Sequence, residues 1–278
     1  MINFFRKKRK ALANDHSYAK ASGGTKALKY MRYAVGEIIL VVIGILIALS
    51  INTWNENRKL RKQEIIYLNN LKNDINAQIK MLDIYINFED LIIDQSKDII
   101  SHYELNNGFH NMDSIFPKLH DLTIRWTFSN ANTTLMQLLN SNQINSIQKR
   151  QLKEELIEYN QQIDLFAKNT NINNTNLIDI FTTATFIEIG SYALYGNSDR
   201  MIKKFEEFYS FETIRVKDIE LKNISIKIIN EPKKKLDLIN KVVYRNTLSS
   251  LQKSGNLALK EKSKQILLML ENEIELHN

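Results

Sequence analysis

One uninterrupted apolar stretch near the N-terminus constrains this chain more than any other feature. Residues 34–54 (AVGEIILVVIGILIALSINTW) carry a single ionisable side chain, Glu37. About 20 helical residues, rising about 1.5 Å each, match the roughly 30 Å hydrocarbon core of a bilayer. No second stretch of this kind follows in the sequence. The chain is therefore expected to cross a membrane once.

The flanks of this stretch favour a retained anchor. Tyr30 and Tyr33 on one side and Trp54 on the other are expected to be interface anchors, because amphipathic rings prefer the level of the lipid headgroups. A cleaved signal sequence is the alternative, since residues 38–51 have the length of its apolar region and Ala48-Leu49-Ser50 resembles a cleavage site. Against it stand the long leader of 33 residues and the lack of a helix breaker ahead of that site.

Charge predicts the orientation. Residues 1–33 hold nine lysine and arginine residues against one acid, Asp15, and those 8 net positive charges exceed the +7 of the whole chain. We expect this basic tail to stay in the cytoplasm. A nearly neutral remainder argues against a nucleic-acid partner. Membrane lipid is the expected partner of a basic cluster in the tail, and a role in topology alone is the alternative. The cluster comprises Arg6, Lys7, Lys8, Arg9 and Lys10.

Composition beyond the membrane segment predicts long helices. The chain has no cysteine, which excludes disulfides and thiol chemistry. Only two prolines and eight glycines occur, and none lies between Gly44 and Gly108. We therefore expect an all-α fold with a cytoplasmic tail (1–33), a transmembrane helix (34–54) and an extracytoplasmic helical domain (55–278).

Apolar spacing divides the extracytoplasmic domain. Steps of three and four residues predict a stalk helix over about 55–105, which ends at Asn106-Asn107-Gly108, and a bundle over about 113–276. Within the bundle, helical segments are expected around 113–139, 147–186 and 233–276, with a break in the Asn- and Thr-rich stretch 169–185. Residues 216–229 fit either a helix or a short strand. The core is expected to include Ile124, Trp126, Phe128, Leu135, Leu138, Leu139, Leu152, Leu156, Tyr159, Ile163, Phe166, Leu177, Phe181, Ala184, Leu236, Ile239, Val243, Leu248, Leu251, Leu257, Ile266, Leu267, Leu270 and Ile274.

Two segments share a pattern. Residues 135–144 and 248–257 both read Leu, Leu, Ser, a turn-forming residue, an amide and an aliphatic residue. This similarity suggests a duplicated helical hairpin, in which a helix ends in a turn and restarts. Chance similarity in a chain rich in leucine and asparagine is the alternative.

The N-terminal residues resemble a known family. The box YxxGEIxLVVIGILIALxINxWNE at residues 33–56, preceded by Phe4-Phe5-Arg6-Lys7, is similar to an uncharacterised family of single-span membrane proteins of Bacteroidota. Further similarity covers residues 64–74 (EIIYLNNLKND) and 133–159, although Asn142 stands where the family usually has glycine. The resemblance implies a cell-envelope protein with a helical extracytoplasmic domain. It implies no catalytic residue.

One face of the membrane helix is small and polar. At about 100° per residue, this face gathers Glu37, Val41, Gly44 and Ala48, with Asn52 at its margin. Gly44-x-x-x-Ala48 would let two backbones approach closely, so we expect a homo-oligomer through this face. Glu37 itself lies near the apolar edge, where it would snorkel to water or meet Arg32. Alternatively, Glu37 is a functional carboxylate of a channel or an ion-driven motor.

Catalysis is not expected. The sequence lacks the phosphate loops, nucleophile elbows and dinucleotide fingerprints that place reactive groups. His102, Glu104, His110, Asp113, His120 and Asp121 do not have the spacing of a metal site. We expect no enzyme, cofactor or metal. Two functions remain: an interaction, sensory or scaffold protein of the bacterial inner membrane with a periplasmic domain and an envelope protein partner, or a subunit of an oligomeric channel or motor that uses Glu37.

Overall fold

A computed structural model describes residues 23–110, 112–194, 198–205 and 214–276 of the chain. Helices with connecting turns and extended segments make up these described residues, and no strand occurs among them. The prediction of an all-α fold is confirmed. Contacts divide the chain into two units, Met1–Lys62 and Gln63–Asn278, which are described separately.

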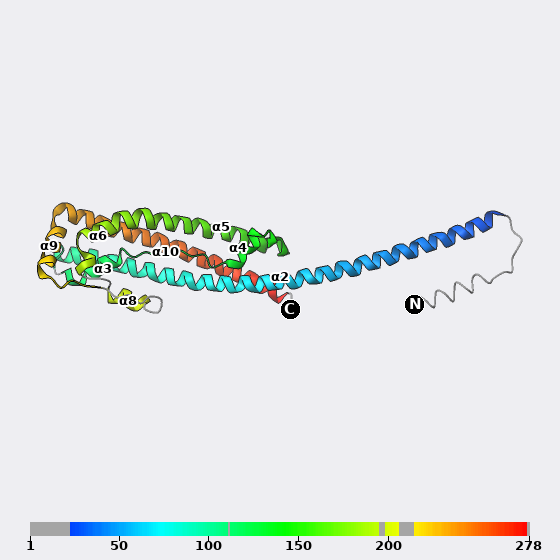
Figure 1. Cartoon of the computed structure of the whole chain (residues 1–278), viewed down its shortest axis with the longest axis horizontal. Coiled ribbons are helices and arrows are strands. Elements are labelled where there is room, and N and C mark those ends of the chain that lie inside the picture. The colour runs from blue at the N-terminus through cyan, green and yellow to red at the C-terminus, as the bar shows by residue number, and fades with distance from the viewer. Residues whose placement is uncertain (1–22, 111, 195–197, 206–213, 277–278) are drawn as a thin grey trace. The chain divides into compact units, whose positions relative to one another are not determined.

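The first described element is the helix α2, Gly23–Asn106, drawn in blue to cyan in Figure 1. It contains the predicted membrane segment and the predicted stalk without an interruption. Every side chain from Tyr30 to Trp54 is exposed. The helix ends where the sequence predicts, because Asn107 adopts a left-handed backbone (φ 50°) that an asparagine tolerates at a helix end.

The second unit continues with eleven further elements among the described residues. They are η1 (Met112–Ser114), α3 (Phe116–Asp121), α4 (Thr133–Asn140), η2 (Gln143–Ser146), α5 (Arg150–Ile172), η3 (Asn173–Thr183), α6 (Ala184–Glu188), α7 (Ser191–Leu194), α8 (Asp199–Phe205), α9 (Ile219–Asn230) and α10 (Pro232–Glu275). The ambiguous stretch 216–229 therefore contains a helix, which Asp218 caps by accepting a hydrogen bond from the Leu221 amide at 3.1 Å. The sequence also predicts a short helix over 201–211; α8 covers its beginning, and residues 206–211 lie outside the described residues.

The part of α2 in this unit and α10 run antiparallel, and charges align them. Lys72 pairs with Glu271 at 2.9 Å, Asp83 with Lys260 at 2.5 Å and Asp90 with Lys253 at 2.6 Å. Each step along α2 is matched by an equal step backward along α10, so the three pairs belong to one register. Helix α5 packs beside α10, where Lys262 contacts Glu155 at 2.5 Å. Figure 1 shows these long helices side by side.

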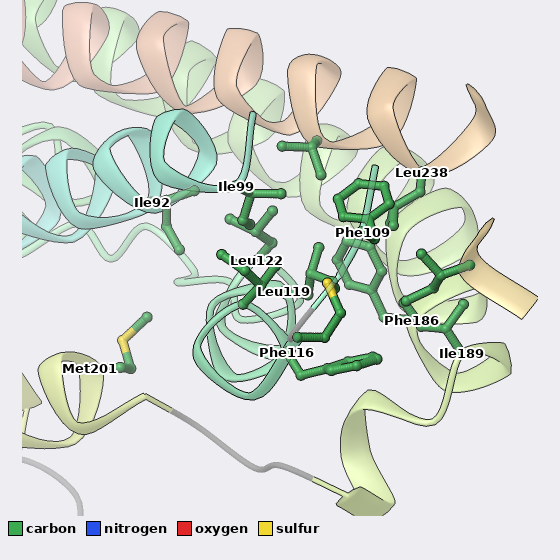
Figure 2. Close-up of a cluster of buried hydrophobic side chains, with 14 of the residues drawn as sticks. Ile92, Ile99, Phe109, Phe116, Leu119, Leu122, Phe186, Ile189, Met201 and Leu238 are labelled. Atoms are coloured by element: carbon green, nitrogen blue, oxygen red, sulfur yellow. The ribbon is translucent and has the colours of Figure 1, made fainter. Parts of the chain in front are cut away.

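Two apolar clusters form the core of the second unit. The first gathers the end of α2, α3, α6, α9 and the beginning of α10, and Figure 2 shows its packed side chains, including Phe109, Phe116 and Phe186. The second gathers the middle of α2, α4, α5 and the end of α10, around Leu71 and Tyr159. On α10 the first cluster ends at Val242 and the second begins at Leu259.

Helix α10 buries Leu248, Ile266 and Leu270 as expected, but most of its first half buries other residues than those expected. Leu236, Val243, Leu251 and Leu257 are exposed, so their assignment to the core is wrong. Apart from Leu248, the buried positions alternate steps of four and three residues and are partly polar: Leu238, Val242, Arg245, Ser249, Gln252, Asn256, Leu259, Ser263, Ile266, Leu270 and Glu273. Apolar residues alone therefore do not mark the face that packs.

The predicted break in residues 169–185 takes the form of the π-helical element η3. A π-helix closes its hydrogen bonds over five residues, which rotates the following side chains relative to an α-helix. Ile178 is buried there, whereas Phe181 and Ala184, both expected in the core, are exposed. Their assignment to the core assumed α-helical spacing through this segment and is wrong.

Two other expectations are wrong for local reasons. Residues 113–139 do not form one helical segment, because an extended stretch separates α3 from α4. The duplicated hairpin is absent, because residues 135–144 include a turn with Asn142 at φ 58°, whereas residues 248–257 lie inside the continuous helix α10. Gly255 lets the Phe166 ring of α5 pack closely against α10, because a Cβ at this position would overlap that ring.

Candidate functional site

The residues predicted for the membrane helix lie exposed on α2. Glu37, Val41, Gly44, Ala48 and Asn52 are all on its surface, and a Cβ added at Gly44 would meet nothing within 4 Å. Asn52 donates a hydrogen bond to Glu56 at 3.1 Å. A second copy therefore has steric access to this face.

The predicted interface anchors are exposed as well. Tyr30, Tyr33 and Trp54 stand at the two ends of the apolar stretch, and the guanidinium of Arg58 lies 5.4 Å from the centre of the Trp54 ring. This cation–π contact places a positive charge beside the aromatic anchor. The basic cluster at residues 6–10 lies outside the described residues.

The two further stretches of family resemblance contact each other in the second unit. Asp74 on α2 accepts hydrogen bonds from the Thr134 amide at 2.6 Å and the Thr133 hydroxyl at 3.2 Å, and so caps the start of α4. Glu64 accepts a hydrogen bond from the Gln148 amide at 2.6 Å, just before α5. Acidic side chains of the segment 64–74 thus hold the segment 133–159 against α2.

A layer of buried polar residues separates the two apolar clusters. It contains Arg245, Ser249, Gln252 and Asn256 of α10 and Glu89 of α2, each at most 5% exposed. Buried polar groups are costly unless they are hydrogen-bonded, so a layer of five in a helical core requires an explanation. The only sequence signal for it is the four-and-three spacing that continues from Leu238 and Val242 through this layer to Leu259.

Arg245 lies at the centre of this layer. Its guanidinium donates hydrogen bonds to the carbonyls of Leu122 and Ile124, both at 3.1 Å, and to the Ser249 hydroxyl. The Glu89 carboxylate lies 3.7 Å away as its counter-charge. Arg245 therefore connects α10 to α2 and to the extended stretch that follows α3.

This extended stretch, residues 122–132, is called the strap below. Its backbone is bonded largely by side chains. The Tyr85 hydroxyl accepts a hydrogen bond from the Ser129 amide at 2.9 Å and donates one to the Thr127 carbonyl at 3.2 Å. Gln78 accepts a hydrogen bond from the Ala131 amide at 2.7 Å, and Asn174 donates one to the Trp126 carbonyl at 3.0 Å. The amides of residues 122–124 bond to backbone carbonyls of residues 118–121, whereas the rest of the strap depends mainly on polar side chains at core positions.

A small cavity lies in the polar layer beside the strap. It measures about 10 Å³, room for about one water molecule, and is lined by Tyr85, Glu89, Trp126, Phe128, Phe166, Thr170, Gln252 and Asn256. Three of its lining residues have a buried polar atom with no hydrogen-bond partner among the described residues: Thr170 Oγ1, Gln252 Nε2 and Asn256 Oδ1. Leaving such an atom unpaired costs about 1–3 kcal/mol. The Glu89 carboxylate faces Arg245 through Oε2.

Burial dominates the electrostatics of the layer. It raises the pKa of Glu89 above its ordinary value of 4.5, and the nearby Arg245 counteracts only part of that shift. Burial likewise lowers the pKa of Arg245, which Glu89 partly restores. Both shifts have the same physical origin, because each charged form loses its hydration inside the bundle.

The acidic and histidine residues considered for a metal site lie elsewhere. A ring nitrogen of His102 is 2.8 Å from the His110 carbonyl oxygen, and Asp121 accepts a hydrogen bond from Gln95 at 2.8 Å. Within the described residues, no group of three or more His, Asp or Glu side chains has the arrangement of a metal site. The polar layer is therefore the candidate functional site of the second unit.

We predict that Arg245→Met destabilises the fold by about 3–5 kcal/mol, because it leaves Glu89 as an uncompensated buried charge. Adding Glu89→Met should restore only part of this loss, since the carbonyls of Leu122 and Ile124 remain without their donor. Thermal unfolding of the detergent-solubilised full chain measures both effects. Arg125→Met is the matched control: its half-exposed ion pair with Asp179 should contribute at most about 1 kcal/mol. A double variant as stable as the wild type would contradict a role of Arg245 in holding the strap.

Glu89→Gln should change how stability depends on pH. A carboxyl group whose pKa is raised by folding binds its proton more tightly in the folded state, so the stability it contributes is present below pH 4.5 and is lost as the pH rises through the raised pKa. The wild type should therefore lose stability relative to the variant as the pH increases from about 4 to about 7. Unfolding temperatures measured in parallel test this, and a constant difference between the two proteins would contradict it.

Comparisons with known proteins give one match. No curated protein and no solved structure matches the chain. Residues 37–157 match the model of a family of unknown function (DUF6090). The matched region is under half of the chain and runs from Glu37 through the apolar segment, the strap and α4 into α5. The chain is thus similar, over the region that contains both the membrane-like segment and the strap, to a family without an assigned activity.

Proposed function

We propose that the protein is a membrane-anchored helical interaction or sensory module of the bacterial cell envelope. The observation that carries this proposal is the exposure of the apolar segment of α2, which includes an 18-residue stretch of mean hydropathy 2.8 with no side chain buried within the chain. Burying a large apolar side chain is favourable by about 1.5–3 kcal/mol of free energy relative to leaving it in water. Exposure of the whole segment to water would therefore cost tens of kcal/mol. A bilayer removes this cost.

The arrangement of the flanks supports a spanning helix. Aromatic side chains stand at both ends of the segment, and the nine basic residues of the tail lie on its N-terminal side. We infer that the tail is cytoplasmic, that the membrane is the inner membrane and that the second unit is periplasmic. In this interpretation the second unit supplies the binding function, with an envelope protein or a ligand as its partner.

Membrane extraction and labelling test this proposal. The full chain should stay with membranes after alkaline carbonate washing and be released only by detergent, and it should retain its N-terminus. Because the chain has no cysteine, single variants report topology directly: Gln151→Cys should react with a membrane-impermeant maleimide in cells with a permeabilised outer membrane, whereas Ser17→Cys should react only after lysis. Release by carbonate, or a mature N-terminus after Ser50, would overturn the proposal.

Self-association through the small polar face of the membrane helix is the second part of the proposal. Gly44→Leu should shift the detergent-solubilised protein to a monomer, because a large side chain prevents the close approach of two backbones. Gly36→Leu is the matched control, since it lies about 80° away around the helix. At both glycines an added Cβ meets nothing within 4 Å, so neither change disturbs the isolated chain. Crosslinking and sedimentation measure the oligomer, and equal behaviour of the two variants would exclude this face.

A further inference from the structure

We propose that Arg58, Lys59, Arg61 and Lys62 form a binding site for the phosphate groups of anionic phospholipids, in the leaflet opposite the basic tail. The proposal rests on the membrane anchor proposed above and names the class of lipid that this end of the anchor binds. The four residues, called the outer basic cluster below, occupy four of five consecutive positions of α2 and belong to the first unit.

The charges of the outer basic cluster are not balanced within the described part of the chain. All four side chains are exposed. Residues 55–62 contain one acid, Glu56, so four positive charges and one negative charge leave a net charge of +3. Glu56 accepts a hydrogen bond from Asn52, and no acidic side chain of the described residues forms an ion pair with any member of the cluster. Lys72, Lys253 and Lys260 of the second unit, in contrast, each pair with a carboxylate.

The height of the cluster along α2 matches the lipid phosphates. At about 1.5 Å per residue, Arg58 and Lys62 lie about 6 Å and about 12 Å beyond Trp54, which marks the apolar edge. The headgroup region of a bilayer extends roughly 5–8 Å beyond each side of the hydrocarbon core. Long lysine and arginine side chains also bend along a helix to bring their charged ends to the polar level. The charges of the cluster therefore reach phosphate oxygens.

Arg58 connects the cluster to the aromatic anchor. Its guanidinium lies 5.4 Å from the centre of the Trp54 ring and donates a hydrogen bond to the Asn55 side-chain oxygen at 3.4 Å. These contacts hold one positive charge beside the ring that marks the membrane surface. A guanidinium has five N–H donors and can bind a phosphate through two of them, so donors remain for a lipid.

The orientation of the membrane helix does not account for this cluster. Basic residues near the end of a spanning helix favour the cytoplasmic side, so the outer basic cluster opposes the orientation that the basic tail sets. Attraction to anionic headgroups offsets this opposition, because it stabilises each lysine or arginine held near the membrane surface. Anionic phospholipid is therefore the partner that fits both the charge and the position of the cluster.

Quenching of Trp54 fluorescence by brominated lipid tests the proposal. The full chain is reconstituted into vesicles of phosphatidylcholine and phosphatidylglycerol at equal mole fractions, with bromine on the acyl chains of one lipid or of the other. The chain has two tryptophans, so the Trp54→Phe protein in the same vesicles supplies the Trp126 signal to be subtracted. Both leaflets have the same composition, so either direction of insertion gives the same result.

We expect brominated phosphatidylglycerol to quench Trp54 more strongly than brominated phosphatidylcholine. The relative partition should be about two- to fivefold, since the attraction of one basic residue to an anionic surface corresponds to about fivefold. Raising the NaCl concentration from about 0.1 M to about 1 M should remove the preference, because the Debye length falls from about 10 Å to about 3 Å.

A triple variant assigns the preference to the outer basic cluster. Lys59→Gln/Arg61→Gln/Lys62→Gln removes three charges but keeps Arg58 beside Trp54, so the surroundings of the fluorescent ring are preserved. This variant should lose most of the preference for phosphatidylglycerol. Quenching is expressed relative to the unquenched protein of the same variant.

A second triple variant is the matched control. Lys80→Gln/Lys97→Gln/Lys168→Gln removes the same number of charges from exposed lysines of the second unit that form no ion pair among the described residues. This control should keep the preference of the wild type. Far-ultraviolet circular dichroism shows whether each variant is folded before quenching is measured.

The outcomes separate this proposal from the membrane anchor. If neither brominated lipid quenches Trp54, the anchor itself is wrong and the lipid site falls with it. Equal quenching by the two lipids leaves the anchor in place and overturns the lipid site. A preference that the cluster variant retains, or one that both triple variants lose equally, also overturns it. A preference that is lost in the cluster variant and in high salt, but retained in the control, supports the proposal.

Discussion

The second unit depends on one constraint: the non-helical strap lies against the helices, with Phe128 buried and Arg125 and Thr127 exposed, and its part-buried amides and carbonyls must be bonded. Helices satisfy their own backbone groups, but the strap does not, so Gln78, Tyr85, Asn174 and Arg245 bond it from core positions. Because a buried backbone group without a partner is costly, these side chains cannot be exchanged for apolar ones without loss. The polar layer, the division of the core into two clusters and the cavity all follow from this arrangement.

The polar layer also accounts for the charge pair at its centre. A buried ion pair contributes little net stability by itself, since each partner loses its hydration. Arg245 donates hydrogen bonds to the carbonyls of Leu122 and Ile124, and Glu89, 3.7 Å away, balances its charge. The pair thus selects one path for the strap between α2 and α10.

The two units meet different physical demands. The described part of the first unit is a helix with an apolar surface, which suits lipid and contact with a second copy. The second unit buries its apolar residues in its own core and aligns α2 with α10 by three charge pairs of one register. One continuous helix serves both demands, because helix formation depends on local backbone hydrogen bonds whereas burial depends on what surrounds each side chain.

The sequence by itself determined the helical class, the single apolar segment, the end of α2 at Asn106 and the irregular helix within residues 169–185, since each depends on local composition or on residues close in the chain. It also identified much of the second cluster, such as Leu135, Leu152 and Tyr159. Only the tertiary structure decided which face of α10 is buried, because Arg245, Ser249, Gln252 and Asn256 face inward to serve the strap and the layer around it while Leu236 and Leu251 face solvent. Spacing rules assume that buried means apolar, and that assumption fails where a distant non-helical segment relies on side chains of the core for its hydrogen bonds.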